Sequence, residues 1–336
     1  MPTKKQDEQF AVHLPGLLSY HARMLSDGVR NDLLRRAIEK SVNRNTSFLE
    51  VGAGSGVWAI LAAKLSAKRV VAVEIDDALI PVIFKLAEEN QVADRIEIIH
   101  GNIDDVKLRG KFDVIVCELF GRNAFGSKVV KSVIKMRKRF LAAGGILIPQ
   151  KLEMYAVPLL SGREGSTLRP NPPVSGKFLR SLLLNYAEEV PLAESAVLKF
   201  AAAPQKLVEI DFRSIKKPLD LVEYSAVWKL KDISRINSFG VFSKSLFSDG
   251  MELDSRRSKS WNLAKYNFEP FDVKVGEIRF GINLDPHKGS WTISLPSNPE
   301  ITRQSYSPVF AFTRARMAQA ATPYKEFGRP NSSRNE

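Results

Sequence analysis

The sequence predicts an α/β protein, in which a Rossmann-like, doubly wound domain is followed by an all-β unit. Two observations predict this fold class. Between Ser47 and Pro149, short runs rich in Val and Ile alternate with longer amphipathic stretches, which is the pattern of a parallel sheet covered by helices. After Pro149 the chain changes to spaced β-like segments that are separated by Gly, Pro, Ser and Asp.

The first half of the chain contains the elements of the doubly wound domain in alternating order. Strands are expected at residues 48–51, 69–74, 96–100, 112–118 and 145–149. Helices are expected at 57–65, 78–91 and 129–141, because apolar residues recur there three and four positions apart. Upstream, Asp27 can cap another helix. The expected inner face of that helix consists of Val29, Leu33, Leu34, Ala37 and Ile38.

The second half predicts strands and two irregular segments. The expected strands are residues 152–159, 202–212, 224–231, 240–246, 278–284 and 291–294. The proline-containing stretch from 161 to about 180 is expected to protrude as an insertion, and 319–336 to form a flexible tail. We therefore divide the chain into a helical segment (1–46), the Rossmann-like domain (47–150), the β unit (151–318) and the tail.

Composition excludes several classes of protein. The apolar runs are all much shorter than the ~20 residues that a membrane-spanning helix needs, so no membrane insertion is expected. The N-terminus lacks the pattern of a secretion signal, which predicts a cytoplasmic protein. Cys117 is the single cysteine, and the four histidines lack metal-ligand spacing. Neither a disulfide nor a bound metal is expected.

The chain is strongly basic, with a net charge of +13. Such a charge can indicate an acidic partner such as nucleic acid. Most of the bases are interspersed with acids, however, and the denser stretches at 131–139, 256–265 and 314–334 are typical of solvated helix faces or a tail. Nucleic acid is therefore a possible partner that the sequence does not favour.

A glycine-rich loop carries the chemical signal. Glu50 ends the first strand, and Gly52, Gly54 and Gly56 follow before the first helix of the domain. Glycine allows the tight turn and the close approach of a ligand to bare backbone at a helix N-terminus. Glu74 ends the second strand, where a carboxylate can accept hydrogen bonds from both hydroxyls of a ribose. The pattern predicts a nucleoside-containing cofactor.

Two residues discriminate between candidate cofactors. A dinucleotide fingerprint has its third glycine at the position of Val57. Glu50 would repel a pyrophosphate but suits an ammonium group, and S-adenosylmethionine carries an ammonium as well as a sulfonium. The sequence therefore predicts S-adenosylmethionine. The alternative is that Glu50 and Glu74 are ordinary strand-end acids of an unused scaffold.

From about His21 to Leu295 the sequence resembles the protein arginine methyltransferases, a family of class I S-adenosylmethionine-dependent enzymes. The resemblance implies that His21 and Arg30 lie on a cofactor-covering helix and contact the cofactor, with Arg30 paired to its carboxylate. It also implies that Asp104 lies near the adenine. Glu118 matches the first of the family's two substrate glutamates.

The second half resembles the family's β-barrel. Ser260-Trp261 is similar to the Thr-His-Trp loop, so the resemblance implies a β-barrel-like domain with Trp261 at the acceptor site. The insertion near 161–180 falls where the family has a dimerisation arm, which implies a homodimer. Phe120, Phe125 or Trp261 can supply an aromatic face for a cationic acceptor.

The acceptor half departs from the family pattern. Ser127 stands where the second substrate glutamate is expected, Lys259-Ser260 replaces Thr-His, and the aromatic motif near the N-terminus is not recognisable. A cation at Lys259 would repel a guanidinium and attract a carboxylate, which favours a free amino acid or another small acidic acceptor.

The function expected from these features is S-adenosylmethionine-dependent N-methyl transfer to a guanidinium or another nitrogen of a protein or small molecule, with Glu118 and Trp261 as catalytic residues. One alternative is a non-catalytic protein that binds the cofactor as a scaffold. Another is a nucleic-acid methyltransferase, although residues 118–121, Glu-Leu-Phe-Gly, lack the Asn/Asp-Pro-Pro-aromatic motif of enzymes that methylate base nitrogens.

Overall fold

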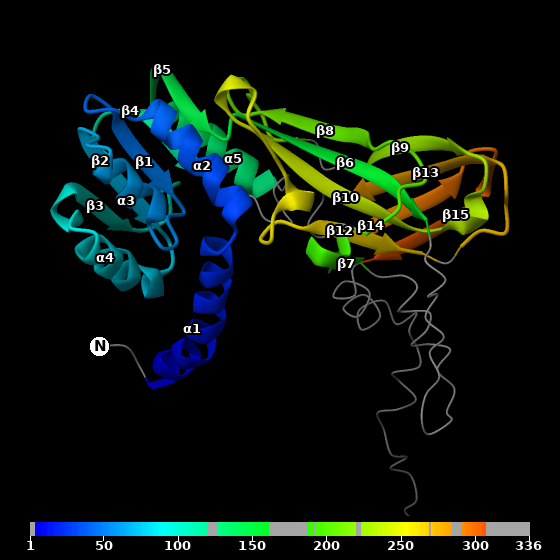
Figure 1. Ribbon diagram of the computed structural model, residues 1–336, viewed down its shortest axis with the longest axis horizontal. Helices are drawn as coiled ribbons and strands as arrows, with labels where there is room; N and C mark the ends of the chain where they lie inside the picture. Colours follow the sequence, from blue (N-terminus) through cyan, green and yellow to red (C-terminus); the bar gives the residue numbers. More distant parts are fainter. Residues whose placement is uncertain are drawn as a thin grey trace, which may run out of the picture.

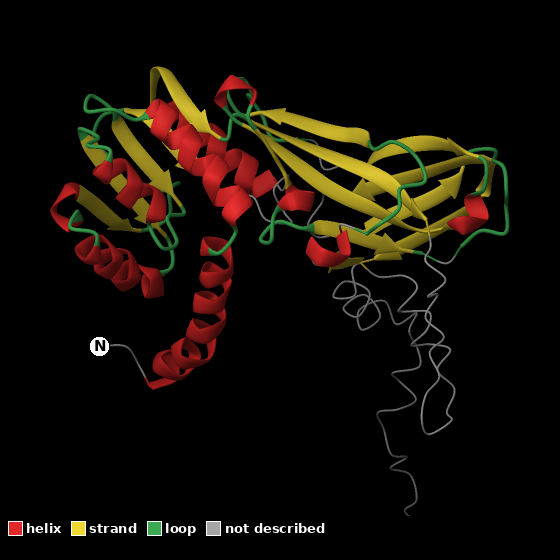
Figure 2. Cartoon of the chain, viewed as in Figure 1, coloured by secondary structure: helices red, strands yellow, loops and turns green. Residues whose placement is uncertain are grey.

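The computed structural model describes residues 4–119, 127–160, 187–190, 192–195, 197–219, 223–268, 270–283 and 290–306. A parallel sheet with its helices forms one end of the molecule, and antiparallel sheets form the other (Figure 1). Helices are concentrated in the first part, and the second part is nearly all strand (Figure 2). The expected α/β fold class with a following β domain is confirmed.

The α/β domain begins with two helices and then alternates strands with helices. The helices are α1 (Lys4–Leu25), α2 (Gly28–Ser41), α3 (Val57–Lys64), α4 (Ile80–Glu89) and α5 (Ser127–Phe140). The strands are β1 (Ser47–Val51), β2 (Arg69–Glu74), β3 (Ile96–His100), β4 (Phe112–Cys117) and β5 (Leu141–Ile148). The sheet order is β3-β2-β1-β4-β5 with parallel neighbours, so the carboxyl ends of the strands share one edge.

Alternate side chains of the sheet belong to different cores. Leu49 and Ile115 pack in a core with residues of α5, such as Val133, whereas Phe48 and Val114 pack in a core with residues of α2, α3 and α4. This alternation follows from the period of two along a strand. Helix α5 therefore covers one face of the sheet, and α2, α3 and α4 cover the opposite face.

The β domain contains two antiparallel sheets. One has the order β7-β12-β10-β6-β8 with β11 paired to β10, and the other has the order β15-β14-β13-β9. The strands are β6 (Lys151–Leu160), β7 (Ala187–Val190), β8 (Gln205–Asp211), β9 (Glu223–Leu230), β10 (Ile236–Leu246), β11 (Glu252–Asp254), β12 (Leu263–Asn267), β13 (Gly276–Asn283), β14 (Ser290–Leu295) and β15 (Asn298–Tyr306), with a short helix α7 (Leu192–Ser195) after β7.

Several expectations need correction. Val29 is 39% exposed and does not belong to the inner face of α2, whereas the neighbouring Arg30 is buried. Strand β5 starts at Leu141 and not at residue 145. Strand β8 starts at Gln205, directly after Pro204, which lacks the N–H that a strand interior needs. Strands β7, β11, β12 and β15 were not expected from the sequence.

No helix among the described residues is long and apolar enough to cross a membrane. In the same part of the chain, no group of three or more His, Cys, Asp or Glu side chains could hold a metal ion.

Candidate functional site

The glycine-rich loop lies between the carboxyl end of β1 and the start of α3. Gly52, Gly54 and Gly56 have φ angles of 67°, 57° and 72°, a region that side chains with a Cβ rarely adopt. The space is also closed to side chains, because a Cβ on Gly54 would lie 2.6 Å from Cε1 of His21. A Cβ on Gly56 would lie 2.6 Å from Cγ2 of Ile83. The backbone of this loop can therefore approach another group closely only with glycine at these positions.

Glu50 is a buried acid beside this loop. Its Oε2 accepts a hydrogen bond of 2.7 Å from the backbone N–H of Ala59, in the first turn of α3. Burial disfavours the charged carboxylate and raises the pKa of Glu50 to about 8. A cation bound nearby would reverse this preference.

Glu74 is held in one orientation by backbone amides. Its Oε2 accepts from the N–H of Gly54 at 2.7 Å, and its Oε1 accepts from the N–H groups of Ile75 and Asp76, both at 2.8 Å. A carboxylate has about four acceptor positions, so these three bonds leave about one for a ligand. The expectation that Glu74 accepts from both hydroxyls of a ribose therefore needs a rearrangement of at least one backbone contact.

Arg30 and Glu118 form a buried, two-pronged ion pair. Nε of Arg30 donates to Oε1 of Glu118 at 3.0 Å, and Nη2 of Arg30 contacts Oε2. Nη1 of Arg30 donates to Oδ1 of Asn31 at 2.6 Å. Burial lowers the pKa of Arg30 to about 10, with the carboxylates of Asp27 and Glu50 opposing this shift. The two predicted site residues therefore contact one another directly.

One pocket brings most of the predicted residues together. It is lined by residues of α1, α2, β1, the glycine-rich loop, α3 and the segment after β4, which include His21, Met24, Arg30, Glu50, Gly52, Gly54, Trp58 and Glu118. The pocket holds about 40 Å³, whereas pockets for drug-sized ligands hold roughly 300 Å³ or more. The ring of His21 lies against Gly54 and narrows the pocket from the side of α1. Burial lowers the pKa of this histidine, so its neutral form is favoured.

Asp104 lies in the loop after β3 and does not line this pocket. Its Oδ2 accepts a hydrogen bond of 3.0 Å from Oγ of Ser132 on α5, while its Oδ1 is buried without a partner among the described residues. Arg139 holds the same loop by donating to the backbone carbonyls of Ile103, Asp104 and Val106. An unpaired carboxylate oxygen is costly to bury, which is consistent with a place for a donor such as an amino group.

Trp261 lies at the junction of the two domains and not in the pocket. Its half-buried side chain packs against both of the large hydrophobic cores, and the backbone N–H of Trp261 donates to Oγ of Ser258 at 3.1 Å. Asp27 anchors this turn, since its Oδ2 accepts from Oγ of Ser258 at 2.5 Å and from the N–H of Ser260 at 2.9 Å. Lys259 is exposed at the same turn.

Five further predictions lie outside the described side chains. These are the two aromatic candidates, the serine at the expected second glutamate, the expected dimerisation arm and the expected flexible tail: Phe120, Phe125, the side chain of Ser127, residues 161–180 and residues 319–336. The backbone of Ser127 begins helix α5.

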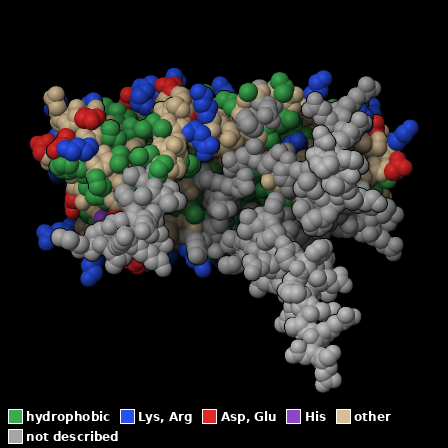
Figure 3. All heavy atoms as spheres, turned by 90° about the horizontal axis from the view of Figure 1, so that it is seen from below, with side chains coloured by type: hydrophobic (Ala, Val, Ile, Leu, Met, Phe, Trp, Pro, Cys, Tyr) green, Lys and Arg blue, Asp and Glu red, His purple; other side chains and the backbone are tan. Residues whose placement is uncertain are grey.

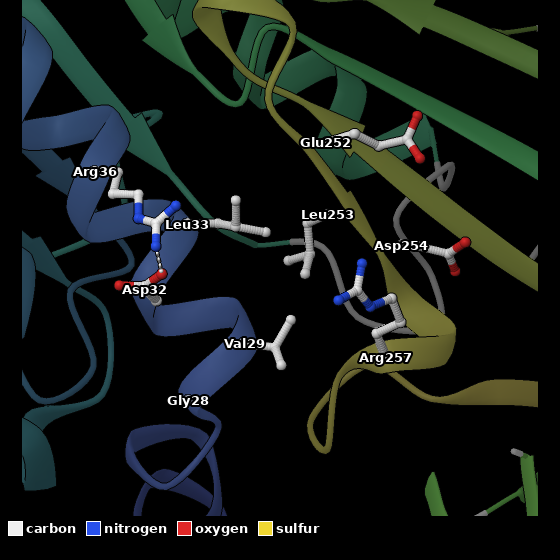
Figure 4. Close-up of a pocket in the computed structure, with 9 residues that line it drawn as sticks. All are labelled: Gly28, Val29, Asp32, Leu33, Arg36, Glu252, Leu253, Asp254 and Arg257. Carbon is white, nitrogen blue, oxygen red and sulfur yellow. Dashed lines mark ion pairs between the residues drawn. The ribbon is translucent and has the colours of Figure 1, made fainter.

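A wider cleft of about 500 Å³ lies on the other side of the first turn of α2 (Figure 4). Val29 and Leu33 of α2 face Leu253 of β11 and Arg257 across it. Asp32 pairs with Arg36 at 2.7 Å on the α2 side. The cleft adjoins the smaller pocket, because Gly28 and Val29 line the cleft and the next residue, Arg30, lines the pocket.

Comparisons with known proteins identify relatives of this chain. A family model described as ribosomal protein L11 methyltransferase (PrmA) matches residues 33–150. A probable protein arginine N-methyltransferase 6.2 of Oryza sativa subsp. indica is 33% identical over 144 residues, which cover 42% of this chain and 36% of the relative. Protein arginine N-methyltransferase 6 of Danio rerio is 29% identical over 210 residues, which cover 59% of each protein.

The chain is similar in sequence to protein arginine methyltransferases over part of its length. The matches span between a third and three fifths of the length of these two relatives. The fold is alike over a longer region. The structure of Arabidopsis thaliana protein arginine methyltransferase 10 covers 86% of this chain and 99% of its own, with a TM-score of 0.66 at 19% identity. The Trypanosoma brucei PRMT1 enzyme–prozyme complex covers 85% and 96%, with a TM-score of 0.69 at 17% identity.

The second role of Asp27 could not be predicted from the sequence. The capping position of Asp27 is visible locally, and its Oδ1 accepts from the N–H of Arg30 at 3.3 Å. Its bonds to Ser258 and Ser260 connect residues more than 200 positions apart. No local sequence signal indicates such a contact. The roles of Ser132 and Arg139 around Asp104 were missed for the same reason.

Proposed function

We propose that the protein is an S-adenosylmethionine-dependent N-methyltransferase that methylates the guanidinium of an arginine in a protein or peptide. The observation that carries the proposal is the contact between Glu118 and Arg30, in which Glu118 already binds a guanidinium through both oxygens. Two of the about four acceptor positions of Glu118 stay available for the guanidinium of an acceptor. The names of the relatives support the same chemistry.

The residues around the pocket fit S-adenosylmethionine in chemical type. Glu50 suits the ammonium group, Arg30 the carboxylate, Glu74 a ribose hydroxyl, and the unpartnered Oδ1 of Asp104 the amino group of adenine. The glycine loop supplies bare backbone beside them. His21 lies over this loop, so α1 has to shift before a ligand of this size can enter.

The chain's own residues position and polarise the acceptor. When bound, the cofactor supplies a methyl group on sulfur: the acceptor nitrogen forms the N–C bond, the C–S pair stays on sulfur, and S-adenosylhomocysteine leaves. Arg30 fixes the plane of the Glu118 carboxylate, which then holds the acceptor guanidinium and draws its positive charge away from the attacking nitrogen. The proton of the methylated nitrogen leaves by way of Glu118.

Lys259, which differs from the family pattern, affects which acceptor the site favours. Lys259 is exposed and does not line the pocket, so its charge does not oppose a guanidinium at Glu118 directly. This favours an arginine in a protein or peptide over the small acidic acceptor that Lys259 suggests in the sequence. Free arginine remains the small-molecule alternative, because it carries the same guanidinium.

The test is transfer of a labelled methyl group to an arginine-rich peptide, with free arginine and a lysine-rich peptide as comparison acceptors. We expect transfer to the arginine-rich peptide, and Glu118→Gln should slow it about 100-fold or more. Glu153→Gln changes another buried glutamate, in the β domain, and should leave the rate within about twofold. Cofactor binding without transfer to any acceptor would contradict the proposal and favour a cofactor-binding scaffold.

We further propose that the protein forms a homodimer. The end of the molecule that holds the α/β domain shows a cluster of hydrophobic side chains in the view from below (Figure 3). Among the described residues Ile75 is 62% exposed and Phe84 is 46% exposed. Large exposed apolar side chains favour a protein–protein interface. The enzyme–prozyme complex of the Trypanosoma neighbour is itself described as heterotetrameric, which supports assembly into oligomers in this fold.

A further inference from the structure

The face of the α/β domain that α5 covers is strongly basic. Residues 119–152 contain eight Lys or Arg and no Asp or Glu. On α5, Lys131, Lys135 and Lys138 are exposed and fall on one stripe of the helix, since they are four and three positions apart. Buried residues such as Val133 hold the opposite side of α5 on the sheet.

Two loops add cations to this stripe. The loop before β4 contributes Lys107, Arg109 and Lys111, and the segment after β8 contributes Lys216 and Lys217, all of them exposed. Together with the three lysines of α5 they make eight cations, which we call the basic surface: Lys107, Arg109, Lys111, Lys131, Lys135, Lys138, Lys216 and Lys217.

Hydrogen bonds connect the three segments, so the basic surface is continuous. Nζ of Lys111 donates to the carbonyls of Lys138 and Arg139, at 3.0 and 2.7 Å, at the end of α5. On the same helix Arg137 donates to the carbonyls of Phe212 and Ile215, beside Lys216 and Lys217. Both loops are thereby fastened to α5.

Few acids compensate these charges. Among the described residues of the two loops and α5, the acids are Asp104 and Asp105, of which Asp104 bonds Ser132. At the adjoining strand ends, Asp211 pairs with Arg213 and Asp113 accepts from the N–H of Ser47. None of the ion pairs between described residues involves Lys131, Lys135 or Lys138. A run of like charges without counterions destabilises the isolated protein through repulsion, and an anionic partner would reduce this repulsion.

We propose that the basic surface binds the phosphate backbone of single-stranded RNA. The neighbouring Cβ atoms of Lys131 and Lys135 are about 5 to 6 Å apart by helix geometry, which suits successive phosphates of one strand. No large apolar side chain of the basic surface is exposed among the described residues, so bases have no stacking platform there. Binding is therefore independent of base sequence, and it is separate from methyl transfer because no residue of the basic surface lines the candidate pocket.

The experiment is fluorescence anisotropy with a labelled single-stranded RNA of about 20 nucleotides, titrated with the full chain between 50 and 200 mM salt. If about five phosphates are neutralised, the slope of log K against log salt is about −3.5, which weakens binding on the order of 100-fold over this range. Lys131→Glu/Lys135→Glu should bind at least about tenfold more weakly and lower the slope to about −2.

The matched control is Lys64→Glu/Lys85→Glu, which makes the same change of charge on α3 and α4, on the opposite face of the sheet. We expect the control to bind within about twofold of the unchanged protein. Equal losses for both variants, or a slope near zero, would overturn the proposal. Polyglutamate that competes as well as unlabelled RNA would overturn it in favour of an acidic protein partner. If the α5 variant does not fold, the proposal is tested by chemical acetylation of the lysines of the unchanged protein with and without RNA. Bound RNA should protect Lys131 and Lys135 from acetylation but not Lys64.

Discussion

Glu50 couples cofactor binding to pH. Burial raises its pKa to about 8, so most of its carboxyl group is protonated at pH 7. An ammonium group beside it favours the carboxylate, which means that binding releases a proton below about pH 8. We expect the affinity for S-adenosylhomocysteine to rise up to about tenfold per pH unit from pH 6 towards pH 8. Calorimetry in buffers of different ionisation enthalpy measures the released proton.

The same group has the opposite effect on the protein without ligand. A carboxyl group with a raised pKa binds more protons in the folded than in the unfolded state, between its ordinary pKa of 4.5 and about 8. The free energy of unfolding should therefore fall as pH rises through this window. Glu50→Gln should remove both pH dependences, and a variant that keeps them would show that another group is responsible.

Arg30 is expected to be irreplaceable by lysine. Its planar guanidinium binds both oxygens of Glu118 and also reaches Asn31, whereas an ammonium is a single point of charge. The carboxylate of the proposed cofactor would also be gripped by two donors of the Arg30 guanidinium, so Arg30→Lys should raise the KM for the cofactor about tenfold, which corresponds to about 1.4 kcal/mol. Steady-state kinetics measures this. A change in kcat alone would assign Arg30 to the acceptor and not to the cofactor.

The types of site residue could be predicted, but their contacts could not. The glycine loop, Glu50 and Glu74 follow from a local pattern of strand, turn and helix. The bidentate contact of Arg30 with Glu118 joins residues 88 positions apart, and the three backbone amides on Glu74 depend on the final path of the loop. Such contacts arise from tertiary packing, which a single sequence does not encode locally.

Asp27 stabilises helix α2 through two sets of hydrogen bonds. The carboxylate caps the helix through Oδ1 and holds the turn of the β domain through Oδ2. Asp27→Ala should lower the free energy of unfolding by about 1 to 3 kcal/mol, since it removes a cap and leaves buried donors unpaired. Urea denaturation measures this loss. Ser258→Ala should cost less, because the N–H of Ser260 keeps its acceptor.

Strands of the α/β domain were predictable because they read as short apolar runs, and the central strands β1 and β2 are buried along nearly their whole length. Residues 69–74 and 96–100 match β2 and β3 in full. Strands β7 and β12 were missed because they contain charged residues, such as Glu188, Glu189 and Lys265. They pair with each other at the edge of their sheet, where side chains need not be apolar.

Self-association is the prediction for the whole molecule. Replacing Phe84 with Asp puts a charge on an exposed apolar site without disturbing the core, since the side chain is 46% exposed. If this surface forms a homodimer, Phe84→Asp should shift the protein to the monomer, as measured by sedimentation equilibrium. Lys85→Ala, at the next position of α4, is the matched control. An unchanged mass for Phe84→Asp would place the interface elsewhere.

The large core that includes Leu49 and Val133 continues without interruption into the β domain, where it includes Phe239 and Trp291. An expression fragment that ends near Pro149 would leave the apolar surface of β6 and β10 behind and present the other half of that core to water. Such a fragment should aggregate during purification. We expect the intact chain to unfold on heating in a single calorimetric peak. The region near Pro149 is therefore not a usable boundary for expressing either domain alone.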